Sequence, residues 1–131
     1  MEKFQRKVKD LTDYNLRLSL NVRNEKLKQS IQGWVIYFRM ADMKDVLVKL
    51  DDELKFRMRV VIWKEWVAQN KQIISLVKLG VSSMEAEGLA WSRKGDYFIG
   101  NSKALKRALS DKMLKEMGVP SAVDYYLRYR V

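Results

Sequence analysis

The stretch SLNVRNEKLKQSIQGWVIYFRM, residues 19–40, decides the fold of this chain of 131 residues. Its apolar side chains recur every three or four residues over about five turns, which is the spacing of one face of an α-helix. Ser19 precedes the pattern and is a typical N-cap residue. The pattern therefore predicts a helix from Leu20 to about Met40. Gly33 lies inside this helix, and we expect it to mark a close approach to another helix.

The segment that follows carries two apolar stripes over residues 46–67, which predict a helix covered on more than one side. We expect Asp42 to be its N-cap. Asp51, Asp52 and Glu53 lie inside the segment, and acidic residues also favour a first helical turn. One long helix and two shorter helices therefore both remain open.

Shorter segments with helical spacing occupy the rest of the chain. We expect helices at residues 2–11, 73–79, 83–91, 103–109, 111–117 and 121–129, with Gly80, Gly118 and Pro120 at helix boundaries. The expected N-caps are Ser82 or Ser83, Asn101 or Ser102, and Ser110 or Asp111. Residues 93–100, RKGDYFIG, are expected to be irregular. Every periodic segment has helical spacing, so we predict an all-α fold: a helical bundle over residues 1–80, then a smaller basic cluster of short helices over residues 81–131.

The composition excludes several classes of protein. The chain has 26 Lys and Arg, 16 Asp and Glu, and neither His nor Cys, so its formal net charge is +10. Without His and Cys it forms no zinc finger, no disulfide scaffold and no catalytic site based on a thiol or an imidazole. The excess positive charge favours nucleic acid as the partner, while a basic surface for solubility and an anionic membrane remain alternatives. No apolar run is long enough to span a bilayer and no signal peptide is present, so we expect a soluble intracellular protein.

Two groups of cations are candidate nucleic-acid-binding residues. The first group comprises Lys55, Arg57, Arg59 and Lys64. Lys55 and Arg59 are neighbours on one helix face while Arg57 points elsewhere, and cations that merely frame a buried helix are the alternative. The second group comprises Arg93, Lys94, Lys103, Lys106 and Arg107. A loop and a helix N-terminal region there combine cations with backbone N–H groups, as phosphate sites do.

The acidic residues Asp51, Asp52 and Glu53 form the one carboxylate cluster that a two-metal site would need. Adjacent helical residues diverge by about 100°, so we interpret them as a solvated first turn. Residues 95–102 resemble a phosphate-binding loop only loosely, because Asn101 stands in place of the lysine. We expect no catalytic residue, no metal ligand and no cofactor.

Two longer stretches carry a family resemblance. They are GWVIYFRMADMK, residues 33–44, and RMRVVIWKEW, residues 57–66. Together they resemble the maturase-specific region of group II intron reverse transcriptases. Residues 94–109 and DYYL, residues 124–127, resemble the terminal segment of many bacterial members.

The resemblance implies a fold and a function. In that family this region is the thumb, also called domain X, and a helical DNA-binding segment follows it. Residues 1–80 then match the thumb and residues 81–131 the DNA-binding segment. The implied function is that of an RNA-binding module that assists intron splicing and holds the template–primer duplex for reverse transcription. The implied partners are group II intron RNA, the template–primer duplex, target DNA, and the polymerase palm and fingers of the full-length protein, in the bacterial cytoplasm.

The sequence also departs from the family. The aromatic-Ala-Asp-Asp turn of the polymerase palm and the Cys/His endonuclease domain have no counterpart, so we expect a fragment or a truncated protein without polymerase or nuclease activity. We expect reversal of Arg57 and Arg59 to glutamate to weaken RNA binding without loss of helicity. The alternative function is that of a helical protein–protein scaffold, which docks on an acidic partner or on the palm.

Overall fold

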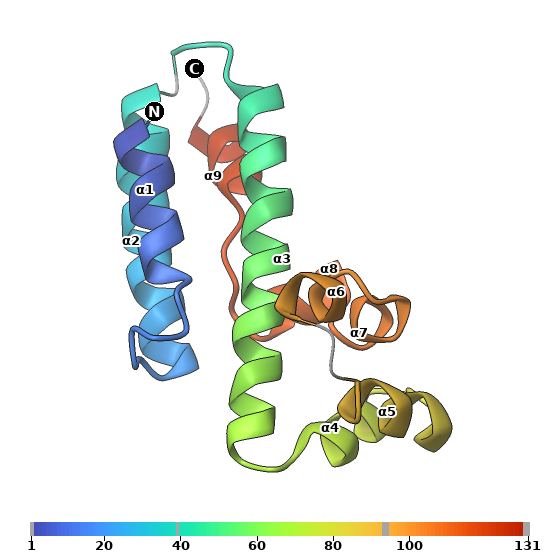
Figure 1. Ribbon diagram of the computed structural model, residues 1–131. Helices are drawn as coiled ribbons and strands as arrows, with labels where there is room; N and C mark the ends of the chain where they lie inside the picture. The colour runs from blue at the N-terminus through green and yellow to red at the C-terminus, as the bar shows by residue number, and fades with distance from the viewer. Residues whose placement is uncertain (1, 39, 93–94, 130–131) are drawn as a thin grey trace.

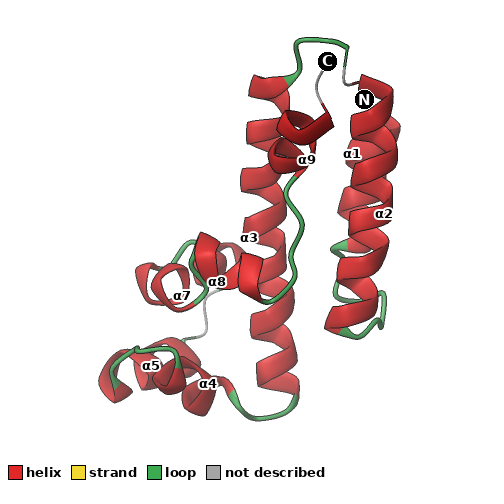
Figure 2. Ribbon diagram, turned by 180° about the vertical axis from the view of Figure 1, so that it is seen from behind, coloured by secondary structure: helices red, strands yellow, loops and turns green. Residues whose placement is uncertain are grey.

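The computed structural model describes residues 2–38, 40–92 and 95–129 (Figure 1). These residues form helices and connecting loops without a strand (Figure 2), so the prediction of an all-α fold is confirmed. In chain order the helices are α1 (Glu2–Leu11), α2 (Leu20–Phe38), α3 (Lys44–Ala68), α4 (Gln72–Lys78), α5 (Ser83–Ala90), α6 (Asp96–Gly100), α7 (Lys103–Ala108), α8 (Asp111–Glu116) and α9 (Ala122–Tyr129). Among the described residues, no helix has the length and apolar character needed to cross a membrane.

Helix α2 begins where the sequence predicts. The Ser19 side chain accepts a hydrogen bond from the backbone N–H of Val22, with 3.2 Å between oxygen and nitrogen. The buried face of the helix carries Leu27, Ile31 and Val35 at helical spacing. Helices α1 and α9 both pack against α2, so the apolar stripe is covered from two sides.

The expectation for Gly33 is wrong. Gly33 is exposed, and no heavy atom lies within 4 Å of the position that a Cβ would take. The next residue, Trp34, makes the contact with α1 instead, because its ring stacks on Phe4 with 5.8 Å between the ring centroids. A large aromatic side chain and not a small residue therefore sets the approach of α1 and α2 at this level.

Helix α3 is one continuous helix of 25 residues, which decides between the two alternatives left open by the sequence. Its N-cap is Met43 and not Asp42, and no side chain caps this end. The interpretation of Asp51 as a solvated residue is also wrong, because Asp51 is only 4% exposed. The acidic stretch therefore marks no helix start.

The Asp51 carboxylate caps α9 across the bundle. It accepts hydrogen bonds from the Ser121 hydroxyl at 2.6 Å and from the backbone N–H groups of Ala122 at 2.7 Å and Val123 at 3.0 Å. N–H groups in the first turn of a helix have no partner within that helix. The buried carboxylate of α3 thus supplies acceptors that α9 lacks, and it fixes the start of α9 against α3.

The short helices after Gly80 follow their local signals. Ser82, Ser102 and Ser110 each accept a hydrogen bond from the backbone N–H three residues further on. Gly80 and Gly118 follow α4 and α8 with φ angles of +96° and +95°, in the left-handed region that favours glycine. These caps and stops confirm the predicted boundaries.

The expectation of an irregular stretch over residues 93–100 is wrong for its second half, because residues 96–100 form α6. At Gly100 this helix packs against α3: a Cβ there would lie 2.5 Å from the Phe56 ring and 2.9 Å from the Val60 side chain. Only glycine allows this approach. The contact with α3 stabilises a helix too short to be stable alone.

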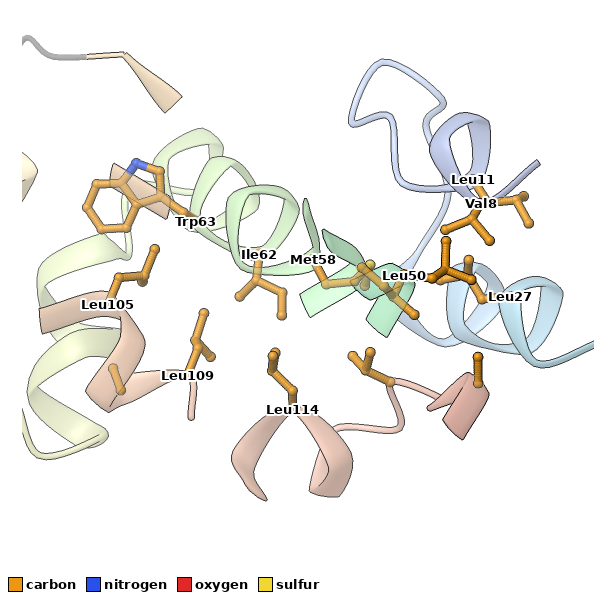
Figure 3. Packing of buried hydrophobic residues seen from close by; sticks show 14 of the residues in the cluster. Val8, Leu11, Leu27, Leu50, Met58, Ile62, Trp63, Leu105, Leu109 and Leu114 are labelled. Atoms are coloured by element: carbon orange, nitrogen blue, oxygen red, sulfur yellow. The ribbon is translucent and has the colours of Figure 1, made fainter. Parts of the chain in front are cut away.

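The buried apolar side chains form one cluster that runs along α3 (Figure 3). At one end Leu50 lies near Leu27 of α2, and at the other end Trp63 lies near Leu105 of α7 (Figure 3). Helix α9 lies between α2 and α3 (Figure 1), where the buried Tyr126 donates a hydrogen bond to the carbonyl of Ala41 at 2.6 Å. Residues 1–80 and 81–131 thus contribute to the same core, and the boundary between them stays a prediction.

Candidate nucleic-acid interface

Helix α3 directs its four candidate cations to two opposite sides. Lys55 and Arg59 are four residues apart and face α8, where both contact Asp111. The Lys55 ammonium lies 3.2 Å and the Arg59 guanidinium 3.0 Å from the Asp111 carboxylate. Arg59 also donates a hydrogen bond from Nε to the carbonyl of Leu109 at 2.7 Å. These contacts hold α8 on α3.

The electrostatics at Asp111 agree with this geometry. Burial acts to raise the pKa of Asp111, but the hydrogen bonds and charges of Lys55 and Arg59 outweigh it, so that the pKa is lowered. Arg59 is only 8% exposed. Reversal of Arg57 and Arg59 to glutamate would therefore break internal contacts, and it cannot separate RNA binding from folding as the sequence led us to expect.

Arg57 and Lys64 lie on the other side of α3, seven residues and about two helical turns apart. Arg57 donates hydrogen bonds to the Thr12 hydroxyl at 2.6 Å and to the carbonyl of Lys9 at 3.1 Å, at the end of α1. The Lys64 ammonium lies over the Tyr14 ring, 5.8 Å from its centroid. Both cations are therefore placed beside residues 12–19, which connect α1 and α2.

The loop 12–19 has a fixed shape because Arg23 of α2 holds its backbone. The Arg23 guanidinium is 1% exposed and donates hydrogen bonds to the carbonyls of Leu11 at 2.6 Å, Asp13 at 2.9 Å and Leu16 at 2.7 Å. Burial lowers the pKa of Arg23, and the charges of Asp13 and Glu65 offset part of this effect. The guanidinium of a buried arginine remains protonated inside a protein. A buried cation therefore organises the loop.

The loop presents two residues that sequence analysis missed, Tyr14 and Arg17. The Arg17 guanidinium lies 5.9 Å from the centroid of the Tyr14 ring, which Lys64 also approaches. Lys9 lies in the last turn of α1, and its carbonyl accepts hydrogen bonds from the Thr12 hydroxyl at 3.1 Å and from Arg57 at 3.1 Å. We call the loop-cation cluster the four cations at or beside this loop together with the Tyr14 ring: Lys9, Tyr14, Arg17, Arg57 and Lys64.

Exposure and charge make this cluster a candidate phosphate-binding surface. Lys9 and Arg17 are exposed, and neither forms an ion pair with any residue that the structure describes. Residues 12–18 are mostly polar and lie between two predicted helices, which by itself indicates only a connection. The signal available in the sequence is a tyrosine and an arginine, Tyr14 and Arg17, close together in a short loop. The contact of Tyr14 with Lys64 arises only from the packing of the loop on α3.

The C-terminal cations form a separate surface. Lys103 and Lys106 are exposed on α7, and Arg107 forms an ion pair with Glu85 of α5. Helix α7 lies on the opposite side of α3 from α1 and α2 in both views (Figures 1 and 2). Arg93 and Lys94 lie outside the described residues. The predicted site residues are therefore divided between the α8 contact, the loop-cation cluster and the α7 surface, and their contact with nucleic acid stays a prediction.

The side chains at these surfaces are suited to binding. Within the described part of the chain, no group of three or more acidic side chains is arranged to hold a metal ion. Asp111 and Glu65, two carboxylates at these surfaces, accept hydrogen bonds from neighbouring side chains. The arrangement therefore offers fixed positive charges and aromatic surface.

Comparison with known families identifies the family of the chain. The family model for the group II intron, maturase-specific domain matches residues 1–76, more than half of the chain. The chain belongs to this family. A maturase-specific domain has a role in intron splicing and is a non-catalytic region, so the resemblance seen in the sequence is confirmed. A comparison with curated proteins found no match to the chain. All five members of the loop-cation cluster lie within the matched residues of this maturase-specific domain.

Proposed function

We propose that this maturase-specific domain binds the sugar–phosphate backbone of group II intron RNA through the loop-cation cluster and thereby assists splicing. The observation that carries the proposal is the meeting of the loop 12–19 and α3 at one ring, with Arg17 and Lys64 both within 6 Å of the Tyr14 centroid. Phosphate contacts position a nucleic acid and dominate its affinity. The cluster supplies four such cations from a rigid support.

The rigid support of the loop-cation cluster favours RNA as a specific partner over unselective attraction of any polyanion to a basic surface. Arg23 fixes the loop backbone through three carbonyls, and Arg57 ties α1 to α3 through Thr12. The backbone that carries the cations therefore needs little rearrangement when RNA binds, which favours recognition of a folded RNA by its shape. This function requires no chemistry from the protein.

The proposal extends to roles in reverse transcription and in binding of target DNA. We propose that the matched residues act as a reverse transcriptase thumb, which holds the template–primer duplex and contacts the palm and fingers of a full-length protein. The exposed Lys103 and Lys106 of α7 are suited to target DNA. The place of action of such a protein is the bacterial cytoplasm, without a membrane partner.

The cluster is tested by the triple variant Lys9→Gln, Arg17→Gln and Lys64→Gln. Each cation that contacts a phosphate contributes about 0.7–0.9 to the slope of log affinity against log salt concentration. We expect the variant to bind intron RNA more weakly and with a slope shallower by about 2–3. Filter-binding titrations at four salt concentrations measure both quantities. Arg57 is left in place because it forms hydrogen bonds within the fold.

The matched control removes three exposed lysines elsewhere: Lys44→Gln, Lys49→Gln and Lys78→Gln. The net charge changes equally in both variants. We expect the control to keep nearly the slope of the unchanged protein, because only non-specific attraction is reduced. Equal slopes in the two triple variants would mean that net charge, and not the cluster, determines binding.

A second candidate function is docking on a protein partner such as the polymerase palm. It is favoured by Tyr37 and Met40, which are 75% and 76% exposed in the stretch 33–44. A protein scaffold would bind RNA weakly and without selectivity. Competition with heparin distinguishes the two functions, because a generic polyanion displaces unselective binding at equal charge but displaces shape-specific RNA binding poorly.

A further inference from the structure

The groove beside the loop-cation cluster has the shape and chemistry of a site for a single nucleotide. We infer that it receives one unpaired nucleotide of the bound RNA, with the base inside and its phosphates at Arg17 and Lys64. This inference rests on the proposed RNA-binding function and deepens it. Proteins that read RNA by sequence or by local shape commonly take up unstacked bases from loops and bulges.

The groove has a volume of about 510 Å³ and is formed by the loop 12–19, the first turn of α2, the second half of α3 and Met117. Pockets of about 300–1,000 Å³ are typical for small ligands. Met117 is held at the groove, because Asn24 of α2 donates a hydrogen bond to its carbonyl at 3.0 Å. The site is therefore preformed by parts of the chain far apart in sequence.

The polar groups in the groove suit a base better than a phosphate. The Glu65 carboxylate accepts hydrogen bonds from the Tyr14 hydroxyl at 3.3 Å and from the Gln69 amide at 2.7 Å. A carboxylate repels a phosphate but accepts hydrogen bonds from the amino and imino groups of a base. Gln69 offers both a donor and an acceptor. These two residues can therefore contact the Watson–Crick edge of a base.

The aromatic residues of the groove suit a planar ligand. Tyr14 and Trp66 both line it, and Trp66 is only partly buried. Stacking on an aromatic side chain is a main source of affinity for unpaired bases. Arg17 and Lys64 at the Tyr14 ring would then lie beside the phosphates that flank the base. The cations at the Tyr14 ring and the acceptors of Glu65 and Gln69 along the groove thus complement the phosphates and the base of a nucleotide.

Arg23 provides an independent sign of a ligand. It lines the groove and is 1% exposed, and its Nε–H has no acceptor among the described residues. An unsatisfied buried donor is destabilising, and such groups commonly have a water or a ligand as their partner. A base carbonyl or ring nitrogen that enters the groove, directly or through a water, would satisfy this donor.

Two RNA hairpins with the same stem test the site. One contains a single unpaired adenosine as a bulge in the stem, and the other has the same closing loop and a fully paired stem. We expect fluorescence anisotropy to show about tenfold tighter binding of the hairpin with the unpaired nucleotide, because stacking is gained only there. Equal affinities for both hairpins would overturn the nucleotide site and leave the proposed function intact. Failure to bind the hairpins and intron RNA alike would remove the proposed function and the site together.

The substitution Tyr14→Leu removes the ring and should abolish the preference for the hairpin with the unpaired nucleotide. The affinity for the paired hairpin should change little. The matched control is Tyr37→Leu, because Tyr37 is more exposed but lies outside the groove. We expect the control to keep the preference. An equal loss for both hairpins in Tyr14→Leu would show that Tyr14 acts only in backbone binding, and it would overturn the site.

Two further measurements do not depend on the folding of the Tyr14 variant. Glu65 is exposed, and Glu65→Gln should weaken binding of the unpaired-nucleotide hairpin alone. In the unchanged protein, 4-thiouridine at the unpaired position should crosslink within residues 12–19 or 61–69 after irradiation. Crosslinks confined to α1, α5 or α7, or equal effects of Glu65→Gln on both hairpins, would contradict the assignment.

Discussion

Replacement of Arg23 by methionine is expected to lower the free energy of unfolding by about 4 kcal/mol. Methionine keeps the apolar stem of the side chain, but it leaves the carbonyls of Leu11, Asp13 and Leu16 without their donor. Each buried polar group that loses its partner costs about 1–3 kcal/mol, and two of these three carbonyls are only partly buried. Urea denaturation followed by circular dichroism measures the change.

The control for this variant is Arg17→Met, the same chemical change at an exposed position of the loop that Arg23 holds. Exposed substitutions of this kind change stability by about 0.5 kcal/mol or less. If Arg23→Met and Arg17→Met were equally stable, the loop would not depend on the buried guanidinium. The description of the loop-cation cluster as a rigid surface would then be wrong.

Replacement of Asp51 by alanine is expected to lower the free energy of unfolding by about 3 kcal/mol. The substitution leaves the Ser121 hydroxyl and the N–H groups of Ala122 and Val123 without their acceptor at the start of α9. Burial raises the pKa of Asp51, and these hydrogen bonds together with Lys55 offset part of that rise. We expect α9 to lose its protection from hydrogen exchange before the rest of the bundle.

The neighbouring residue provides the matched control for Asp51. Asp52 is exposed on the same turn of α3, and Asp52→Ala should change stability by about 0.5 kcal/mol or less. Thermal denaturation of the two variants under identical conditions makes the comparison. Equal stability of both variants would show that α9 does not need the buried carboxylate.

Much of the fold could be predicted because its signals are local. Ser82, Ser102 and Ser110 cap helices that begin one residue later, and Gly80 and Gly118 stop helices within the same few residues. Asp51 could not be interpreted in this way, since its partners lie 70–72 residues further along the chain. Its sequence neighbours, Asp52 and Glu53, suggested a solvated turn, and only the packing of α9 shows why the first of the three is buried.

The role of a glycine within a helix also could not be predicted from the sequence alone. Gly33 and Gly100 both lie in helices, and a glycine there indicates either a close approach or nothing at all. Gly33 meets no neighbour, whereas Gly100 lies against Phe56 and Val60 of α3. Sequence spacing contains no information about which helix face meets a partner outside the segment, so the two cases could not be distinguished.

The candidate site could be predicted only in part. Helical spacing correctly separated Arg57 from Lys55 and Arg59, because residues two apart on a helix face different sides. The partner of Lys55 and Arg59 is Asp111, more than fifty residues away, and it could not be found from spacing. Tyr14 and Arg17 were missed because the loop 12–19 gains its shape from Arg23, a charged residue on the otherwise apolar face of α2.

Acetylation of lysines in the presence and absence of intron RNA tests the central claim most directly, because it identifies the surface that RNA covers in the unchanged protein. We predict that RNA slows the acetylation of Lys9 and Lys64 several-fold, while the exposed Lys44 and Lys49 react at the same rate in both states. Unchanged rates at Lys9 and Lys64, with protection of Lys103 and Lys106 instead, would contradict RNA binding at the loop-cation cluster.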